Sequence, residues 1–415
     1  MTIEQFTIDI PQSPLDDLSR RLEHIRWPTL AADEDWQKGV PSHFLKSLMD
    51  SWRNDFNWRE QEAELNRFSH YRSEIDGYHI HFIYQRGKGP TPVPLILTHG
   101  WPDSFTRYQK VIPYLTDPAR FGGSPEDAFD VIIPSIPGFG FSSCPHPAGL
   151  NNARVAKLWF KLMTDRLGYQ SFCAAGGDIG SSVTRYLAAL YPDHLTAIHL
   201  TDVGIIRDLM THPQPETLTE EEQAYRQSAA RWVREEGGYM SIQSTKPWTL
   251  AYGLNDSPAG LAAWIAEKYR SWSDCGGDLF NSFTPDEVLT NITLYWLTES
   301  IGTSAHIYRE NLSSLPPLQK STVPVGVACF PADILPPPRS FAEKHYHICR
   351  WSNMPRGGHF PSMEEPELFA DDVRAFFRAY RLAEDSRPFY GLRRNIRPGQ
   401  GYASRQIAVK SGSRR

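Results

Sequence analysis

Short apolar runs alternate with amphipathic segments between Pro94 and Leu200. The runs have the length of buried strands and lie at Leu95–Thr98, Val131–Ile133, Phe172–Ala175 and Leu195–Leu200. Residues 152–167 show helical spacing between two of these runs. Because strand and helix signals alternate with short loops, the pattern predicts an α/β fold with a mostly parallel sheet and helices on both faces. In such a sheet the chemistry lies beyond the carboxyl ends of the strands.

The first 90 residues show a different pattern. Apolar residues at helical spacing mark three short segments, the first of them around Leu18 and Leu22. Turns such as Trp27-Pro28 separate the segments, so the pattern predicts a helical meander that packs on a larger body. The stretch Ile75–Tyr84 then alternates about Asp76-Gly77, which is typical of a β-hairpin.

Strand signals stop after about residue 202 and resume at Val325. Two capping boxes, Thr219 with Glu222 and Thr284 with Glu287, begin predicted helices in the interval. The interval therefore reads as a helical insertion that covers the strand ends as a lid. The predicted division is an N-terminal meander (1–90), a first part of the α/β core (91–202), the lid (203–320), a second part of the core (321–380) and a C-terminal tail (381–415).

Charge and cysteine usage narrow the function classes. The 415 residues hold 43 Lys and Arg against 48 Asp and Glu, a formal net charge of −5, so no basic field points to nucleic acid. Five scattered cysteines without a C-x-x-C pair predict free thiols in a reducing compartment rather than a zinc site. With no signal-like or membrane-spanning run, we expect a cytoplasmic protein without a membrane anchor.

The tail from Arg381 differs from the rest of the chain. It holds nine basic residues against two acids and has little apolar content. This composition predicts a disordered or loosely docked extension.

Asp178 lies where a predicted strand runs into a predicted helix. The surrounding sequence, Gly177-Asp178-Ile179-Gly180, resembles a nucleophile elbow, whose usual form is G-x-S-x-G, with Asp in place of Ser. Flanking glycines suit such a turn because it is strained and closely packed. The alternative is that Asp178 only caps the following helix, since Asp is a favoured N-cap residue.

A base and an orienting acid are needed beside an elbow nucleophile, and they follow it in the order nucleophile, acid, histidine. Asp333 follows one predicted strand after the insertion, and His359 follows the next. Separately they could be an ordinary loop acid and a surface histidine, but their joint position at consecutive strand ends favours a triad. The poorer candidates for the acid are Asp193, Asp202 and Asp274.

An aspartate nucleophile restricts the substrate. Attack on an ester or amide would give a mixed anhydride, whereas attack on an sp³ carbon gives an alkyl ester that water can cleave. The electrophile is then an epoxide or an alkyl halide, and epoxide opening calls for a proton donor such as tyrosine. In the lid, position favours Tyr239 and Tyr308 as donors. The tyrosines that spacing leaves as rivals are Tyr225, Tyr252, Tyr269 and Tyr295.

Seven motifs in order give the chain a family resemblance. They are His99-Gly-Trp-Pro102, Gly177-Asp178-Ile-Gly180, Gly238-Tyr239 with Thr245-Lys-Pro247, Leu254-Asn-Asp-Ser-Pro258, Tyr308-Arg-Glu-Asn311, Phe330-Pro-Ala-Asp333 and Arg356-Gly-Gly-His359-Phe360. Together they resemble the microsomal-type epoxide hydrolases, including the soluble fungal and bacterial members. The resemblance implies an α/β-hydrolase fold and conversion of a lipophilic epoxide and water to a vicinal diol, without a metal or organic cofactor.

The resemblance also implies roles for single residues. Asp178 would be the nucleophile, His359 the base and Asp333 the acid that orients it. Tyr239 and Tyr308 would donate to the epoxide oxygen. The backbone N–H groups of Trp101 and Ile179 would form the oxyanion hole. The membrane anchor of mammalian relatives is not carried over to this chain, and a homodimer is one open arrangement.

Two other functions remain as alternatives at this stage. Haloalkane-type dehalogenases typically place Trp or Arg directly after the nucleophile, where this chain has Ile179. A non-catalytic α/β-hydrolase that binds a small ligand commonly lacks a triad member, whereas all three residues are present here.

Overall fold

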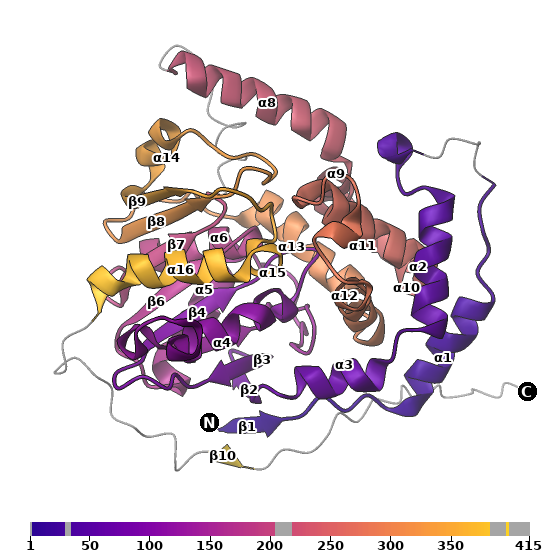
Figure 1. Ribbon diagram of the computed structural model, residues 1–415, viewed down its shortest axis with the longest axis horizontal. Helices are drawn as coiled ribbons and strands as arrows, with labels where there is room; N and C mark the ends of the chain where they lie inside the picture. Colours follow the sequence, from indigo (N-terminus) through magenta and orange to yellow (C-terminus); the bar gives the residue numbers. More distant parts are fainter. Residues whose placement is uncertain (1, 30–34, 204–217, 382–395, 398–415) are drawn as a thin grey trace, which may run out of the picture.

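A ten-stranded sheet forms the centre of the protein (Figure 1). The computed structural model describes residues 2–29, 35–203, 218–381 and 396–397. The strand order is β10-β1-β2-β3-β5-β4-β6-β7-β8-β9. The strands are β1 (Ile3–Phe6), β2 (His70–Ile75), β3 (Tyr78–Gln85), β4 (Val93–Thr98), β5 (Phe129–Pro134), β6 (Phe172–Gly176), β7 (Leu195–Leu200), β8 (Pro324–Cys329), β9 (His347–Asn353) and β10 (Ile396–Arg397).

The sheet is parallel from β5 to β9 and antiparallel from β1 through β2 and β3 to β5. Alternate side chains of its central strands enter two different cores. Ile96 of β4 packs with α5 (Asn152–Lys161) and α6 (Ile179–Leu190), whereas Leu97 packs with α4 (Ile112–Thr116) and α16 (Pro366–Phe377). Helices thus cover both faces, and the prediction of a mostly parallel α/β sheet is confirmed.

The predicted hairpin is confirmed as β2 and β3, with Ile75 paired to Tyr78. Asp76 and Gly77 in its turn both have positive φ, at 52° and 84°. Such a turn matches the twist of the two strands, and glycine takes it up without steric cost. Strand β1 was not predicted, because four residues with a buried, exposed, exposed, buried order do not alternate.

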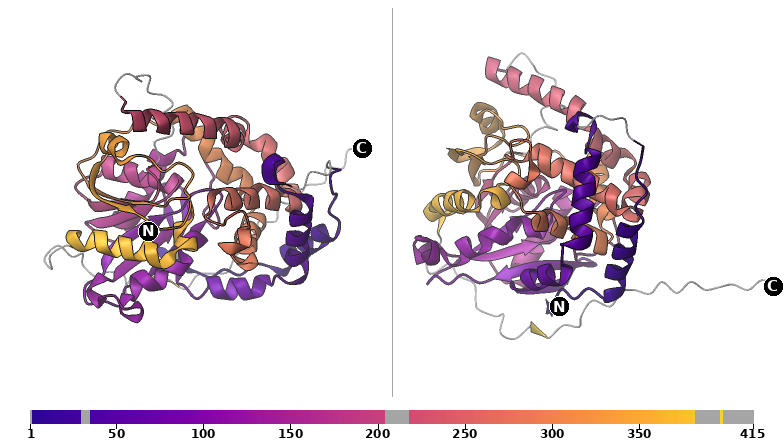
Figure 2. Two further views of the ribbon diagram at one scale, coloured as in Figure 1. Left: turned by 45° about the horizontal axis from the view of Figure 1, so that its top comes forward. Right: turned by 45° about the vertical axis from the view of Figure 1, so that its right-hand side comes forward.

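Three N-terminal helices brace the helices that follow β7. They are α1 (Gln12–Glu23), α2 (Ser42–Asn54) and α3 (Trp58–Leu65). Helices α1 and α2 pack against α11, and α3 packs against α12. Figures 1 and 2 show this group of helices together at one side of the sheet. The meander predicted from the sequence is therefore helical and packed on a larger body.

A run of helices separates β7 from β8, as the sequence predicts. It comprises α8 (Glu220–Glu236), α9 (Gly238–Thr245), α10 (Pro247–Asp256), α11 (Pro258–Trp272), α12 (Pro285–Leu297) and α13 (Ile301–Ser314). Both predicted capping boxes are present, at Thr219 with Glu222 and at Thr284 with Glu287. The division into five domains stays a prediction. Residues 204–217 of the predicted lid, and most of the predicted basic tail, lie outside the described residues.

Short elements complete the chain. Further α-helices within the described residues are α14 (Arg339–His345) and α15 (Pro361–Glu364). The 3₁₀ or π turns are η1 (Trp36–Lys38), η2 (Phe105–Val111), η3 (Pro118–Phe121), η4 (Pro125–Asp127), η5 (Leu162–Arg166), η7 (Leu279–Asn281) and η8 (Arg378–Tyr380).

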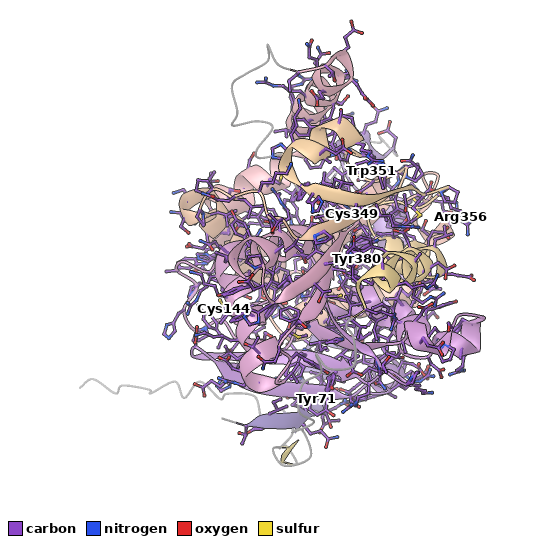
Figure 3. The ribbon with its side chains drawn as sticks, turned by 90° about the vertical axis from the view of Figure 1, so that its left-hand side faces the viewer. Tyr71, Cys144, Cys349, Trp351, Arg356 and Tyr380 are labelled. Carbon is purple, nitrogen blue, oxygen red and sulfur yellow. The ribbon has the colours of Figure 1, made fainter. Side chains whose placement is uncertain are left out.

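All five cysteines lie within the described residues and are free thiols, as predicted. Figure 3 shows two of them on one side of the molecule, Cys144 and Cys349. Cys349 lies on the edge strand β9, where it contacts Tyr380.

Candidate active site

The turn between β6 and α6 presents Asp178. Its backbone has φ 57° and ψ −129°, a region that is costly for a residue with a Cβ and that is found at functional turns. Within the described residues its side chain makes no capping hydrogen bond to α6, so the helix-cap alternative is wrong. A Cβ on Gly180 would lie 1.9 Å from the carbonyl oxygen of Thr98, so the turn requires glycine there.

Asp333 and His359 meet Asp178 beyond the carboxyl ends of β6, β8 and β9. His359 Nδ1 lies 2.7 Å from Asp333 Oδ1, and its N–H donates because an ionised carboxylate only accepts. His359 Nε2 faces Asp178 Oδ2 at 3.4 Å, which is the distance of an ion pair rather than of a short hydrogen bond. The His359 side chain is 2% exposed, while Asp333 and Asp178 keep 10% and 14%.

The charge state of His359 depends on these two carboxylates. Burial alone would lower its pKa, but the charges and hydrogen bonds of Asp333 and Asp178 outweigh burial and raise the pKa to about 10. At neutral pH the imidazole therefore carries a proton as long as both carboxylates are ionised.

Backbone contacts fix the position of His359. Its N–H donates to the carbonyl of Trp272 at 2.7 Å. The carboxylate of Glu364 accepts from the N–H groups on either side, at 3.0 Å from Gly358 and 2.8 Å from Phe360. Glu364 was not predicted as part of the site, because nothing in the sequence distinguishes it from the acids that open surface helices.

A buried ion pair, also missed by the sequence analysis, ties the loop after β4 to the loop after β9. Arg107 is paired with Asp103, and its Nη2 donates to the carbonyl of His359 at 2.6 Å. Asp103 Oδ1 accepts from the N–H of Gly100 at 2.8 Å. Burial alone would raise the pKa of Asp103, but mainly the Arg107 guanidinium holds it at about 2. The spacing of four residues was the available signal, but it does not tell a buried pair from an exposed one.

The loop after β4 also approaches Asp178 directly. The N–H of Trp101 donates to Asp178 Oδ1 at 2.9 Å. A Cβ on Gly100 would lie 2.3 Å from the same oxygen, so only glycine permits this approach. Ile179, the other predicted oxyanion donor, is the first residue of α6, and its role as a donor stays a prediction.

Tyr239 and Tyr308 come from two helices of the insertion and meet over Trp101. Tyr239 lies in the first turn of α9 and Tyr308 on α13, with ring centroids 6.0 Å apart. The Tyr239 ring stacks on Trp101 at 5.2 Å, and the Tyr308 ring meets Trp101 edge-on at 6.0 Å. The two phenols are hydrogen-bonded. Burial raises the pKa of both phenols, and the nearby Asp178 charge raises it further, so both stay protonated.

The rival tyrosines have other surroundings. Tyr252 is 83% exposed, and the Tyr295 hydroxyl donates to the carbonyl of Asp103 at 2.9 Å. Tyr269 stacks on the phenylalanine after His359, and Tyr225 packs on a ring of α14. The contacts with Trp101 thus favour Tyr239 and Tyr308.

The rival acids are placed less well than Asp333. Asp193 is exposed, and Asp274 accepts from the N–H of Gly357 at 2.9 Å. Asp202 lies two residues after the end of β7. Asp333 has the short contact with Nδ1 that an orienting acid requires.

Two family models match the chain. The model described as "Epoxide hydrolase N terminus" matches residues 3–108, and the one described as "alpha/beta hydrolase fold" matches residues 93–255. A relative from Stigmatella aurantiaca (strain DW4/3-1), named an epoxide hydrolase, is 46% identical over 91% of this chain and 86% of its own length. The chain belongs to the epoxide hydrolase family.

Further relatives extend this assignment. "Epoxide hydrolase 1" of Sus scrofa is 38% identical over 90% of this chain and 88% of its own length. The solved structure of Aspergillus niger epoxide hydrolase is 30% identical, with a TM-score of 0.80 over 92% of this chain and 97% of that one. The protein is an epoxide hydrolase with the α/β-hydrolase fold. These relatives do not favour the dehalogenase or the non-catalytic binding protein.

Among the described residues, none of the helices combines the length and the apolar character needed to cross a membrane. In the same part of the chain, no group of three or more His, Cys, Asp or Glu side chains is placed to hold a metal ion.

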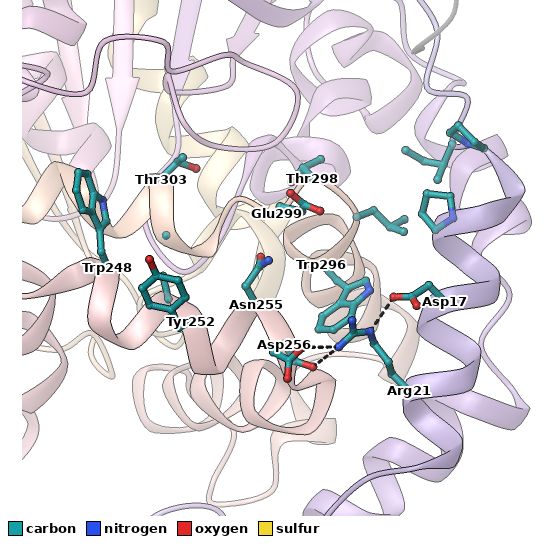
Figure 4. Close-up of a pocket in the computed structure, with 16 residues that line it drawn as sticks. Asp17, Arg21, Trp248, Tyr252, Asn255, Asp256, Trp296, Thr298, Glu299 and Thr303 are labelled. Atoms are coloured by element: carbon teal, nitrogen blue, oxygen red, sulfur yellow. Dashed lines mark hydrogen bonds and ion pairs between the residues drawn. The ribbon is translucent and has the colours of Figure 1, made fainter. Parts of the chain in front are cut away.

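A groove of about 1170 Å³ lies between α1 and the helices α10, α12 and α13 (Figure 4). Arg21 spans it with contacts of 2.7 Å to Asp17 and to Asp256. Trp248 and Tyr252 stand on its wall and are 61% and 83% exposed. Its lining comes from the N-terminal and inserted helices, so the groove is distinct from the site at the strand ends.

Proposed function

We propose that this epoxide hydrolase converts a lipophilic epoxide to a vicinal diol through a covalent ester on Asp178. The observation that carries the proposal is the setting of that carboxylate. Trp101 N–H holds one oxygen at 2.9 Å, and the other oxygen faces His359 at 3.4 Å. His359 is in turn bound to Asp333 at 2.7 Å.

The first step is ring opening. The ionised Asp178 attacks an epoxide carbon and forms the ester bond while the carbon–oxygen bond of the ring breaks. Tyr239 and Tyr308 donate to the oxygen that becomes negative, and one of them passes its proton to it. The tyrosine that has given up its proton must regain one, and in the overall proton balance that proton comes from protonated His359.

Formation of the ester activates the base. The charge on Asp178 disappears when the ester forms, and with it one of the two carboxylates that raise the pKa of His359. Because burial still favours the neutral imidazole, the pKa falls and His359 can accept a proton. The loss of one charge thus couples the two steps.

The second step is hydrolysis of the ester. Neutral His359, oriented by Asp333, takes a proton from a water whose oxygen attacks the carboxyl carbon of Asp178. The N–H groups of Trp101 and Ile179 stabilise the resulting oxyanion. The diol oxygen leaves and takes the proton of the new carboxylic acid. Asp178 is again ionised and His359 again protonated.

Heavy-oxygen water tests this route. In a single turnover we expect the label in the peptide that contains Asp178 and an unlabelled diol, measured by mass spectrometry. Asp178→Ala should form no diol, while Asp193→Ala, at an exposed loop position, should keep its activity. Label in the diol after one turnover, with an unlabelled peptide, would mean direct attack of water on the epoxide and would overturn the proposal.

The substrate class and the setting of the enzyme are part of the same proposal. Aromatic rings of Trp101, Tyr239 and Trp272 gather beside Asp178, which supports lipophilic epoxides such as styrene oxide. The inserted helices act as the lid that carries the oxygen donors. A cytoplasmic location and a homodimer stay predictions.

A further inference from the structure

A buried lysine faces the ring of Tyr239. Lys268 lies on α11, and its side chain is 7% exposed. Its Nζ is 5.0 Å from the centroid of the Tyr239 ring and 5.8 Å from that of Trp272. Lysine is almost never buried to this degree without a partner, and its usual arrangement extends the ammonium group to water.

The partner of Lys268 is the preceding residue. Glu267 Oε2 lies 2.5 Å from Nζ, and the Glu267 side chain is 23% exposed. Glu236, at the end of α8, also lies within the electrostatic reach of Lys268. The ammonium group thus has both carboxylates and aromatic rings as neighbours.

The charged groups around Tyr239 have opposing effects on negative charge at its phenol. Asp178, Asp202 and Glu267 are negative and oppose any build-up of negative charge on the phenol, whereas Tyr308 is hydrogen-bonded to it. An ammonium group facing the ring acts in the opposite sense, because a cation attracts the ring electrons and attracts them more when the phenol shares its proton. Such sharing occurs when the epoxide oxygen becomes negative.

We propose that Lys268 is a positioning residue for ring opening that acts through Tyr239. Its ammonium group holds the ring and stabilises the negative charge that the phenol acquires as it donates to the epoxide oxygen. This inference rests on the proposed function of Tyr239. Hydrolysis of the ester uses His359 and Asp333 instead, so Lys268 should affect the first step selectively.

Single-turnover measurements of ester formation and ester decay with styrene oxide separate the two steps. Lys268→Met keeps the carbon chain but removes the charge, and we expect ester formation to slow on the order of tenfold, equivalent to about 1.4 kcal/mol. Ester decay should change little. Lys268→Arg keeps a cation and should restore most of the rate.

Glu267→Gln is the matched control, because it breaks the same ion pair but leaves the ammonium group in place. If the cation matters, this variant forms the ester at least as fast as the wild type, since it removes a negative charge that acts on Tyr239. If the ion pair is merely structural, both variants slow ester formation to a similar extent, and the inference is wrong. This comparison remains decisive even if Lys268→Met does not fold, because slower ester formation in Glu267→Gln alone overturns the inference.

Tyr239→Phe distinguishes failure of the inference from failure of the proposed function. In that background, Lys268→Met should cause no further loss in ester formation. A loss as large as in the wild-type background would show that Lys268 acts by another route. If Tyr239→Phe itself forms the ester at the wild-type rate, the role proposed for Tyr239 is wrong, and the inference about Lys268 falls with it.

Discussion

At the scale of the residue, the two carboxylates beside His359 have different parts in the proposed reaction. In that reaction, Asp178 at 3.4 Å from His359 is converted to the ester and loses its charge, whereas Asp333 at 2.7 Å takes no part in bond formation. One imidazole can then donate in the resting enzyme and accept in the ester intermediate. The short contact with Asp333 fixes the direction of the imidazole.

His359→Gln should separate the two steps. We expect the ester on Asp178 to form and accumulate while diol release slows by about 100- to 10,000-fold, because the general base is gone. Mass spectrometry of the intact protein after a brief exposure to epoxide measures the adduct. His79→Gln, on the exposed side of β3, serves as the control. A variant that releases diol at the normal rate without an adduct would contradict the role given to His359.

Sequence patterns could predict residues that stand beside strand ends, and this is how Asp178, Asp333 and His359 were found. They could not predict Arg107 or Lys268. Both are charged residues in segments that could equally present them to solvent. Their burial depends on which distant loop or ring lies opposite, and helical periodicity carries no information on that.

At the scale of the element, a chain of buried polar groups runs through the β2–β3 hairpin. His70 Nε2 lies 2.8 Å from the carbonyl of Leu65, and His70 Nδ1 lies 2.9 Å from His81 Nε2. His81 Nδ1 reaches the hydroxyl of Ser135 at 2.9 Å. Burial lowers the pKa of His70 to about 4 and lowers the pKa of His81 well below its ordinary value. Both imidazoles are therefore neutral in the folded protein.

These buried, neutral histidines should make folding sensitive to acid. The unfolded state takes up protons below the ordinary histidine pKa of 6.5, whereas the folded state does not until about pH 4 at His70. The contribution of His70 to stability is thus complete above pH 6.5 and is lost as the pH falls, by about 2 kcal/mol near pH 5. Urea unfolding at about pH 7.5 and pH 5 measures this difference in free energy.

His70→Gln should reduce the difference in the free energy of unfolding between the two pH values, even if it lowers stability at both. His79→Gln should leave the difference unchanged, because His79 is exposed on the same hairpin. An equal pH dependence in wild type and His70→Gln would mean that other groups cause the acid sensitivity.

Local sequence signals predicted single helices, strands and turns better than the contacts between them. The capping boxes, the Asp76-Gly77 turn and the apolar runs specify single helices, one turn and single strands, and all are present. The hydrogen-bonded pair of neutral imidazoles, His70 and His81, was not predicted, because alternate positions on two strands reveal which face they share but not how two rings hydrogen-bond.

At the scale of the whole molecule, the N-terminal helices and the inserted helices depend on each other. Helices α1 and α2 pack against α11, and α3 packs against α12. Leu18, Leu22, Leu48 and Trp52 are buried in the same core as Leu261 and Ile265 of α11. The helix that carries Lys268 thus rests on a part of the chain that lies far away in sequence.

Removal of residues 2–68 should therefore abolish activity and cooperative unfolding, since it exposes the buried faces of α11 and α12. Circular dichroism during heating and diol formation measure the two effects. The control is Arg21→Ala, which removes surface contacts that include the ion pairs with Asp17 and Asp256 and should lower stability by less than about 1 kcal/mol. A truncated chain that unfolds cooperatively and forms diol would show that the inserted helices fold alone.

The order of the strands in the sheet could be predicted from the sequence only in part. Alternation of strands and helices predicted the parallel part of the sheet. It could not predict that β3 would pair with β5, because that pairing depends on contacts between segments with no shared local signal.

The proposed oxygen donors lie on inserted helices, whereas the proposed nucleophile and its base lie on loops of the sheet. Substitutions can therefore change ring opening and ester hydrolysis separately. Substitutions in α9 to α13 can change which epoxides are opened, and the machinery that clears the ester remains intact. A mutant library confined to those helices should yield enzymes with new substrate ranges that all break down the ester of one common substrate at the same rate.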